Sequence, residues 1–258
     1  MKKSSFLGIK MSNNKLIIAE KPRTLQPEIL KQNNLINCSF KELETWSEIH
    51  HDLFNELIAT FQNYEYKDGL FPEMNKRIFI RRATLEKNIN IRRKSNQEIF
   101  ELLKRMRDTS FTIKGIYQAN GYKTTASIAF FNYVYLHEKA GKESYFELEY
   151  TELFALLCDK AYSLKFGNYS KINLLKSTKL KSKYAKALYE LIEANKYKNP
   201  FTLKEYELKS FLKYDVKNYR FSYLVREIEK VYMQIDKLLS FTYIVHKVEK
   251  SITFKLEK

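Results

Sequence analysis

Apolar side chains recur every three to four residues in several stretches of the chain, and this spacing predicts amphipathic helices. One stripe covers residues 43–64 and follows Ser39-Phe-Lys-Glu42, which has the spacing of a helix-capping box. A second stripe covers residues 99–106 and follows the same pattern in Ser95-Asn-Gln-Glu98. We expect the first helix to be long and buried, and the second to keep a polar outer face.

Between and after these helices, apolar and aromatic residues alternate in the manner of β-strands. A short strand is expected at residues 78–80, and longer ones begin at residue 111 and cover 127–137 and 145–150. A short helix is expected over 151–158. The first half of the chain therefore combines helices with a long β-region.

The last third of the chain predicts three helices followed by a two-stranded hairpin. The first helix covers 180–192. Thr202-Leu-Lys-Glu205 is a third capping box before a short helix, and the longest stripe covers about 219–239. Two alternating segments, 241–245 and 252–256, then predict a hairpin. This order is typical of a winged helix, a module that places a helix in the DNA major groove.

The first half repeats this order with additional β-structure, and a polar segment separates the halves. The sequence therefore predicts an α+β fold of two tandem winged-helix domains. We expect domain 1 over residues 39–165, a connecting segment over 166–179 and domain 2 over 180–258. Residues 1–38 have weak periodicity and two prolines, which favours a mobile basic arm.

The net charge of the chain is +16, from 46 Lys and Arg against 30 Asp and Glu. The charge is uneven: residues 75–107 contain eleven basic side chains and three acids, whereas 40–66 is acidic. Such a field favours nucleic acid first and an anionic membrane second, although a lysine-rich proteome would also produce it. The apolar runs are too short to span a bilayer, and the isolated Cys38 and Cys158 suit a reducing cytoplasm.

The helix over 219–239 has an outer face suited to DNA. Arg226 has the geometry to pair with guanine and Asn218 with adenine, while lysines at the helix start and at the hairpin turn suit phosphate contacts. The alternative is an ordinary solvated helix face, which Glu227 and Glu229 favour. The expected DNA contacts of domain 2 are Lys217, Asn218, Tyr219, Arg220, Ser222, Tyr223, Arg226, Lys230, Lys247 and Lys250.

A second DNA-contacting surface is expected in domain 1, around the helix that follows Ser95. Its candidate residues are Arg92, Arg93, Lys94, Gln97 and Lys104. Glu101 lies on the same face, and a solvated loop and helix are the alternative. The aromatic strand at 130–135 suggests base stacking, but such residues more often fill a core.

Signals for catalysis are weak. The chain has no phosphate-binding loop of the G-x-x-x-x-G-K-[ST] type and only four histidines. His50-His51 lacks the spacing of a metal-binding pair, so we expect no metal, no cofactor and no catalytic residue. A tyrosine nucleophile is not excluded by the count of 19 tyrosines.

Leu180-Lys-Ser-Lys-Tyr-Ala-Lys-Ala-Leu-Tyr-Glu-Leu-Ile192 resembles the opening of the second winged helix in the replication initiators of iteron-containing bacterial plasmids. The segment 166–174 is similar to the one joining that family's two domains, and 224–236 looks like its recognition helix. The resemblance is good over 166–258 and weaker, in layout, over 40–160. The long β-region of domain 1 and Glu101 depart from the pattern.

Membership in that family implies a non-enzymatic protein of the bacterial cytoplasm. Its two winged helices would read opposite ends of directly repeated duplex sites at an origin, and its dimers would repress their own gene at an operator inverted repeat. Binding would melt an AT-rich segment and recruit the host initiator ATPase, replicative helicase and primase. A winged-helix transcriptional repressor and a rolling-circle nicking enzyme are the alternatives.

Overall fold

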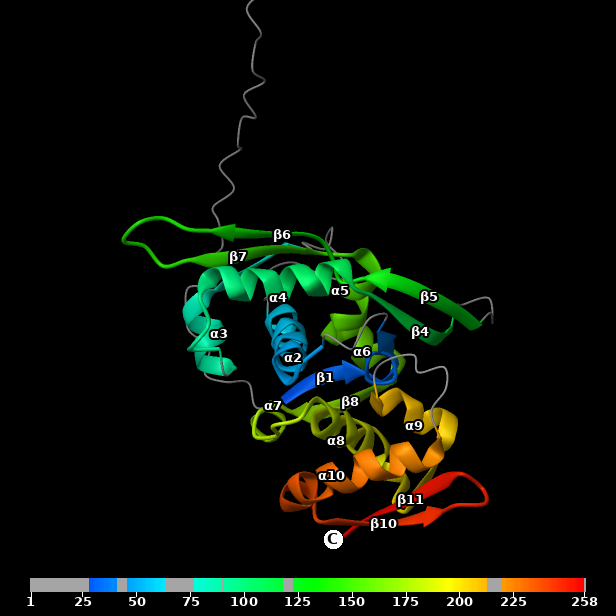
Figure 1. Ribbon diagram of the computed structural model, residues 1–258. Helices are drawn as coiled ribbons and strands as arrows, with labels where there is room; N and C mark the ends of the chain where they lie inside the picture. The colour runs from blue at the N-terminus through cyan, green and yellow to red at the C-terminus, as the bar shows by residue number, and fades with distance from the viewer. Residues whose placement is uncertain are drawn as a thin grey trace, which may run out of the picture.

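The computed structural model describes residues 28–40, 46–63, 77–89, 91–117, 123–212 and 220–257. Its elements are stacked in layers (Figure 1). The β6–β7 hairpin (Phe131–His137 and Tyr145–Tyr150) lies at one end, and the β10–β11 hairpin (Phe241–His246 and Ser251–Leu256) at the other. The helices and the remaining strands fill the space between them, around one continuous hydrophobic core.

The N-terminal half contains a complete winged helix. A buried helix leads to a short strand, two further helices and a hairpin, and the sheet order β3-β7-β6 makes the short strand pair with the second hairpin strand. Before the hairpin, its elements are α2 (Glu48–Gln62), β3 (Arg77–Arg81), α3 (Arg82–Asn88) and α4 (Asn96–Asp108).

The C-terminal half repeats this topology element by element. Its sheet order is β10-β11-β9, so the short strand again pairs with the second hairpin strand. The predicted α+β fold of two tandem winged helices is therefore confirmed. Its helices and first strand are α8 (Lys183–Asn195), the short 3-10 helix η2 (Lys196–Lys198), β9 (Phe201–Lys204), α9 (Glu205–Leu212) and α10 (Phe221–Leu239).

The long β-region of the first half is an insertion between α4 and the hairpin. Strands β4 (Ser110–Tyr117) and β5 (Lys123–Ala129) pair with each other and with β2 (Ser39–Phe40) in a separate sheet. The single strand expected over 127–137 is wrong, because Phe130 separates β5 from β6. Phe130 is fully buried and stacks on Phe111 with ring centroids 4.4 Å apart.

A further layer lies between the two winged helices. The described part of the expected N-terminal arm is not mobile there: residues 28–38 include β1 (Glu28–Gln32) and α1 (Asn33–Ile36), which are tied to the core by Ile29 and Leu35. Residues 1–27 lie outside the described residues. The connecting segment is also structured, because β1 pairs antiparallel with β8 (Tyr169–Asn173). This layer is completed by α5 (Glu152–Cys158), α6 (Lys160–Phe166) and α7 (Leu174–Ser177).

Of the three expected capping boxes, one is confirmed and two are not. The capping box of Ser95 and Glu98 is confirmed. The one expected at Ser39 is wrong, because Ser39 lies in β2 and the helix begins at Glu48, capped by Ser47. Thr202 does not cap a helix either: it lies in β9, where Phe201 and Leu203 are buried and Thr202 is exposed.

Candidate nucleic-acid interface

Helix α10 is the third helix of the second winged helix and presents one face to solvent. Phe221, Leu224, Ile228, Val231 and Ile235 are buried at the spacing of one helical stripe. The helix therefore cannot rotate without exposing its apolar side. This fixes which polar residues point outward.

The outward residues at the N-terminal part of α10 are mostly those expected. Arg220, Ser222 and Lys230 are exposed, and Arg226 is 62% exposed. Tyr223 is half-buried and packs against the core, with the Arg226 guanidinium 5.2 Å from its ring centre. Tyr223 therefore supports Arg226 in addition to presenting an edge to solvent. Of the other candidates, Lys217, Asn218 and Tyr219 lie outside the described residues.

Glu227 changes the charge of this face. It is only 6% exposed and accepts a hydrogen bond from Lys230 Nζ at 2.7 Å. Its carboxylate also lies 3.8 Å from Arg226 Nε. Lys230 is thus partly neutralised, whereas the ion pair of Arg226 is longer, so Arg226 is the better candidate for reading a base.

The turn of the β10–β11 hairpin adds a second contact region. Residues 247–250 form this turn, and Lys247 and Lys250 are both exposed in it. The Tyr232 ring of α10 contacts the Phe241 and Tyr243 rings, so β10 runs back along α10. The turn therefore lies towards the N-terminal end of α10 (Figure 1).

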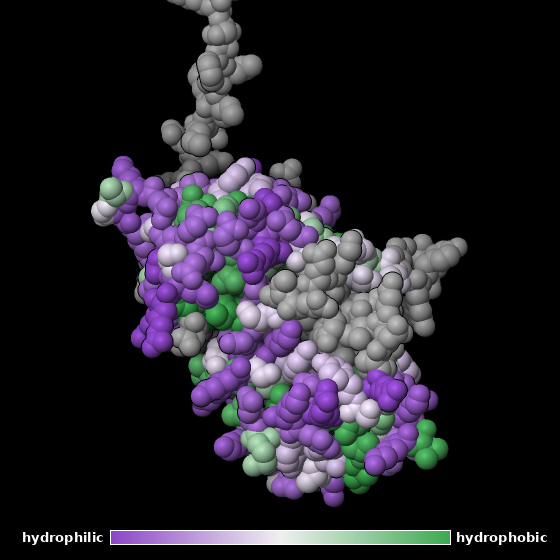
Figure 2. Space-filling model, viewed as in Figure 1, coloured by the Kyte–Doolittle hydropathy of each residue, from purple (hydrophilic) through white to green (hydrophobic). Residues whose placement is uncertain are grey.

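The tip of the hairpin is not purely basic. Val248 is 90% exposed between the two lysines, and Lys250 Nζ lies 3.9 Å from the Glu205 carboxylate. Figure 2 shows hydrophilic side chains over most of this side of the molecule, with small apolar patches between them. An exposed valine at a wing tip is suited to van der Waals contact with a sugar or base edge.

The expected contact residues of the first winged helix lie together before and along α4. Arg92 and Arg93 are exposed in the turn that precedes the helix, and Gln97 is exposed on its first turn. Lys94 and Lys104 are half-buried. All five lie at one end or on one outer face of α4.

Acidic residues balance this α4 face. Glu101 accepts a hydrogen bond from Gln97 at 3.1 Å and lies 3.8 Å from Lys104 Nζ. Lys94 Nζ lies 3.7 Å from Glu98, which also caps the helix. The α4 face is therefore less attractive to phosphates than the turn at Arg92 and Arg93.

Two functional candidates were not found from the sequence. Arg105 is exposed on α4, and the same helical projection that placed Lys94 and Gln97 also places it on the outer face. Arg82 holds the basic turn: its guanidinium donates to Lys94 O at 2.8 Å and to Glu86 Oε1 at 2.7 Å. In the sequence, the only signal for this structural role of Arg82 is its i,i+4 spacing to Glu86.

The aromatic strand divides between core and surface. Phe130, Phe131 and Val134 are buried, as the core interpretation expected. Tyr133 and Tyr135 stack on each other at 4.6 Å on the opposite side of the sheet, where Tyr135 is more than half exposed. The Tyr133 hydroxyl donates to Glu147, so this surface also carries negative charge.

The histidines have structural contacts. His50 Nδ1 accepts the Ser47 N–H at 3.1 Å, which closes the cap of α2. Burial and nearby cations lower the pKa of His50 to about 4, so the ring is a neutral acceptor at pH 7. Among the residues that the structure describes, no three His, Cys, Asp or Glu side chains gather as metal ligands do.

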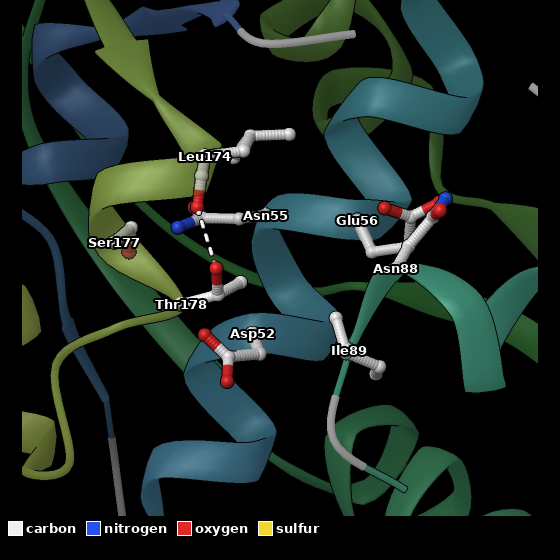
Figure 3. A pocket seen from close by; sticks show the side chains of 8 residues that line it. All are labelled: Asp52, Asn55, Glu56, Asn88, Ile89, Leu174, Ser177 and Thr178. Carbon is white, nitrogen blue, oxygen red and sulfur yellow. Dashed lines mark hydrogen bonds between the residues drawn. The ribbon is translucent and has the colours of Figure 1, made fainter. Parts of the chain in front are cut away.

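A small cavity lies between α2, the end of α3 and α7 (Figure 3). Its volume is about 10 Å³, room for roughly one water molecule. Burial raises the pKa of Asp52 to about 6, against the effect of nearby Lys186. The lining residues are Asp52, Asn55, Glu56, Asn88, Ile89, Leu174, Ser177 and Thr178.

Two winged helices in tandem, each with an outward third helix and basic side chains beside it, define a class of duplex-DNA-binding proteins. The family model of the WH1 domain of initiator replication proteins matches residues 28–193, more than half of the chain. The chain belongs to this family of initiator replication proteins. The match begins at β1 and ends within α8, so it includes the layer between the two hairpin sheets.

A solved structure agrees with this fold. The chain is similar to the Pi initiator protein, crystallised in complex with iteron DNA, with a TM-score of 0.56 and 17% identity; the match covers 89% of this chain and 96% of that one. Domains 2 and 3 of RctB match with a TM-score of 0.46 and 11% identity, over 81% of this chain and 82% of that one. No curated protein matches the chain significantly. No helix in the described part of the chain has the length and apolar character needed to cross a bilayer.

Proposed function

We propose that this protein initiates plasmid replication by binding directly repeated duplex sites at an origin. The observation that carries the proposal is the exposed cationic start of α10 beside the lysine-bearing turn of its own hairpin. In a winged helix these two regions contact the major groove and the adjacent backbone. The family to which the chain belongs, and the iteron complex of the similar Pi initiator protein, support the same assignment.

Within this proposal the two winged helices have unequal roles. The second, over residues 180–258, reads bases through Arg226 and, from the segment before α10, Asn218. Lys217, Tyr219, Arg220 and Lys247 hold the backbone. The first, over residues 39–165, contacts phosphates through Arg92 and Arg93, because its α4 face is balanced by Glu98 and Glu101.

The proposed mechanism is non-covalent and uses no metal or cofactor. Several copies bound to adjacent repeats bend the duplex, and the additional protein–DNA interactions that the bend permits offset the energy of deforming it. A neighbouring AT-rich segment then melts, and the host initiator ATPase, replicative helicase and primase assemble on it. Dimers bind an inverted repeat at the operator and repress the gene. All these steps take place in the bacterial cytoplasm.

Titration of the DNA that flanks this gene tests the proposal. We expect tight binding to direct repeats that are each about two helical turns long, weak binding to a scrambled duplex, and intact strands afterwards. A lone inverted repeat as the only bound site would instead identify a transcriptional repressor. Metal-dependent cleavage that leaves protein on a 5′ end would identify a nicking enzyme.

The hairpin turn has its own test. Lys247→Ala should weaken binding to specific and scrambled duplexes alike and reduce the slope of log K against log salt by about one unit. Lys255→Ala is the matched control, because Lys255 is also an exposed lysine of the hairpin but lies on β11 away from the turn. An unchanged salt slope in Lys247→Ala would remove the wing from the proposed interface.

A further inference from the structure

Helix α8 is buried on every side. Nine consecutive residues, 185–193, are buried, although only about half of a surface helix normally is. It contacts α2, α1 and β8 on one side and α9 and α10 on the other. This helix is therefore the common element between the two winged helices (Figure 1).

The side of α8 that faces the N-terminal half is charged. Lys186 and Glu190 are one helical turn apart, and both are at most 1% exposed. Glu190 binds Lys31 of β1, with Lys31 Nζ 2.9 Å from Oε1 and 2.8 Å from Oε2. Asn55 of α2 closes the group: it accepts from Lys31 Nζ and donates to Glu190 Oε1, both at 2.9 Å.

A second ion pair lies one turn earlier along α8. Lys186 Nζ donates to Asp52 Oδ1 of α2 at 2.7 Å and to the Ser177 carbonyl of α7 at 2.8 Å. Two charged residues on one stripe of α8 are thus bound to three different elements: α2 of the first winged helix, and β1 and α7 of the layer between the two winged helices. Such directed bonds fix both the rotation of α8 and its position along its axis.

The opposite side of α8 is apolar. Leu188 and Leu191 project away from the Lys186–Glu190 stripe at 100° per residue, towards the side that α9 and α10 occupy. Apolar packing holds α10 on α8, while charged groups hold α8 on α2 of the first winged helix and on β1 and α7 beside it. The rotation of α8 is therefore transmitted directly to α10.

Buried ion pairs add little to the free energy of folding, because the cost of desolvating the two charges offsets most of their attraction. Apolar residues of equal volume stabilise a protein as much or more. Hydrogen-bonded ion pairs are directional, however, whereas apolar contacts are not. We propose that Lys31, Asn55, Asp52, Lys186 and Glu190 are positioning residues that set the placement of α10 relative to α4, and hence the spacing of DNA half-sites that both winged helices engage at once.

The effect on half-site spacing rests on the proposed function, because it concerns a duplex bound by both winged helices. Inserting one base pair between two half-sites rotates one relative to the other by about 34° and separates them by about 3.4 Å. A rigid junction cannot follow that change, whereas a loosened one can. The placement of α10 relative to α4 does not depend on DNA and is tested separately.

Spin labels on the two outer helices measure the placement directly. They are attached at Gln97→Cys on α4 and Met233→Cys on α10, both exposed positions. The native thiols do not compete: Cys38 and Cys158 are fully buried, and burial raises the pKa of Cys158 well above its ordinary value. The distance distribution between the labels is compared in the otherwise unaltered chain and in variants of the buried group.

The main variant combines Lys31→Met, Asn55→Leu and Glu190→Met, which preserves volume and leaves no buried charge unpaired within that group. We expect it to fold with unchanged helix content but with a shifted and broadened distance distribution. Glu190→Gln should broaden it less. Glu193→Gln is the matched control on the same helix, because Glu193 pairs with Lys196 of the adjoining η2, at 2.7 Å, rather than with the N-terminal half.

An unchanged distribution in the folded triple variant overturns the proposal. If the triple variant does not fold, Glu190→Gln decides the question: a distribution identical to that of Glu193→Gln overturns it, and a broader one supports it. The readout is a distance between two helices, so a general loss of stability in a still-folded variant does not imitate the effect.

Binding then tests the consequence for DNA, with a duplex selected from random sequence by the unaltered protein and the same duplex with one inserted central base pair. The unaltered protein should lose at least about tenfold in affinity on insertion, and the folded triple variant less than about threefold. Equal losses overturn the spacing role. If no duplex binds, the proposed function fails, while the label distances still decide the positioning role.

Discussion

Replacing Arg226 by alanine separates DNA recognition from folding, because the side chain does little for the fold. It is 62% exposed, and its contacts are the Glu227 carboxylate at 3.8 Å and the Tyr223 ring at 5.2 Å. A partly exposed ion pair and an exposed cation–π contact each stabilise a protein by about 1 kcal/mol or less. Arg226→Ala should therefore unfold at nearly the same urea concentration as the unaltered protein.

The loss in DNA binding should be larger. A bidentate arginine–guanine contact discriminates against other bases by about 1–3 kcal/mol, which is about 5- to 150-fold in affinity. The assay is fluorescence anisotropy at one fixed salt concentration, with a panel of duplexes in which each base pair of the bound repeat is replaced in turn. Arg226→Ala should bind the best duplex more weakly and lose its preference at one position of the panel.

Lys237→Ala is the matched control for this experiment. Lys237 is also an exposed cation of α10, but it lies in the last turn, about 16 Å further along the helix. It should leave both affinity and base preference nearly unchanged. Unaltered affinity and base preference in Arg226→Ala, or equal losses in both variants, would refute the assignment of the α10 N-terminal face to base reading.

Four further predictions concern stability. Glu190→Gln should lower the free energy of unfolding by about 3–5 kcal/mol in urea titrations, because it leaves Lys31 buried beside an uncharged partner. Glu193→Gln should lower it by about 1 kcal/mol or less, and equal losses in the two variants would contradict this interpretation. Phe130→Ala should cost about 3–5 kcal/mol by the same assay, since its ring is fully buried among other aromatic rings, and a loss below about 1 kcal/mol would place it outside the core. Burial lowers the pKa of His50 from 6.5 to about 4, so the unfolded chain binds a proton first and about 3 kcal/mol is lost as pH falls through that window. Burial raises the pKa of Asp52 from 3.8 to about 6, which favours the folded chain as pH falls from 6 to 3.8. Asp52→Asn should therefore lose stability more steeply in acid than the unaltered protein, and parallel pH curves would contradict the assignment of Asp52.

The long helices and the C-terminal hairpin were predictable because their periodicity is extended. The buried stripe of α10 from Phe221 to Ile235 has the spacing that the sequence suggested, and this spacing fixes the outer face that contains Arg226. Apolar residues alternate in both hairpin strands, and the hairpin forms where this alternation predicted it, with Phe241 and Phe254 buried. Local pattern and tertiary packing agree in these elements.

Short elements were predictable at β3, β7 and α5, but not where a capping pattern and a strand pattern compete over the same few residues. Thr202 and Glu205 match a capping box, but Phe201 and Leu203 gain more from burial beside β11 than Thr202 does from capping. Phe130 stands in a continuous apolar run, where nothing in the sequence indicates that one residue leaves the sheet.

The layer between the winged helices was missed for an electrostatic reason. Lys31, Asp52 and Glu190 read as solvent-exposed charges, because single charges are almost never buried without a partner. Their partners lie far apart in the chain: Lys31 and Glu190 are separated by 159 positions. Only the fold brings them together, so neither β1 nor the charged side of α8 was recognisable from local sequence.

Footprinting on the supercoiled DNA that flanks this gene tests the central claim most directly. The protein should protect a series of directly repeated sites, each about two helical turns long, and open a neighbouring AT-rich segment to single-strand-specific reagents, with both strands left uncut. Protection of no repeated site, or a cut strand with the protein attached to its end, would contradict the account.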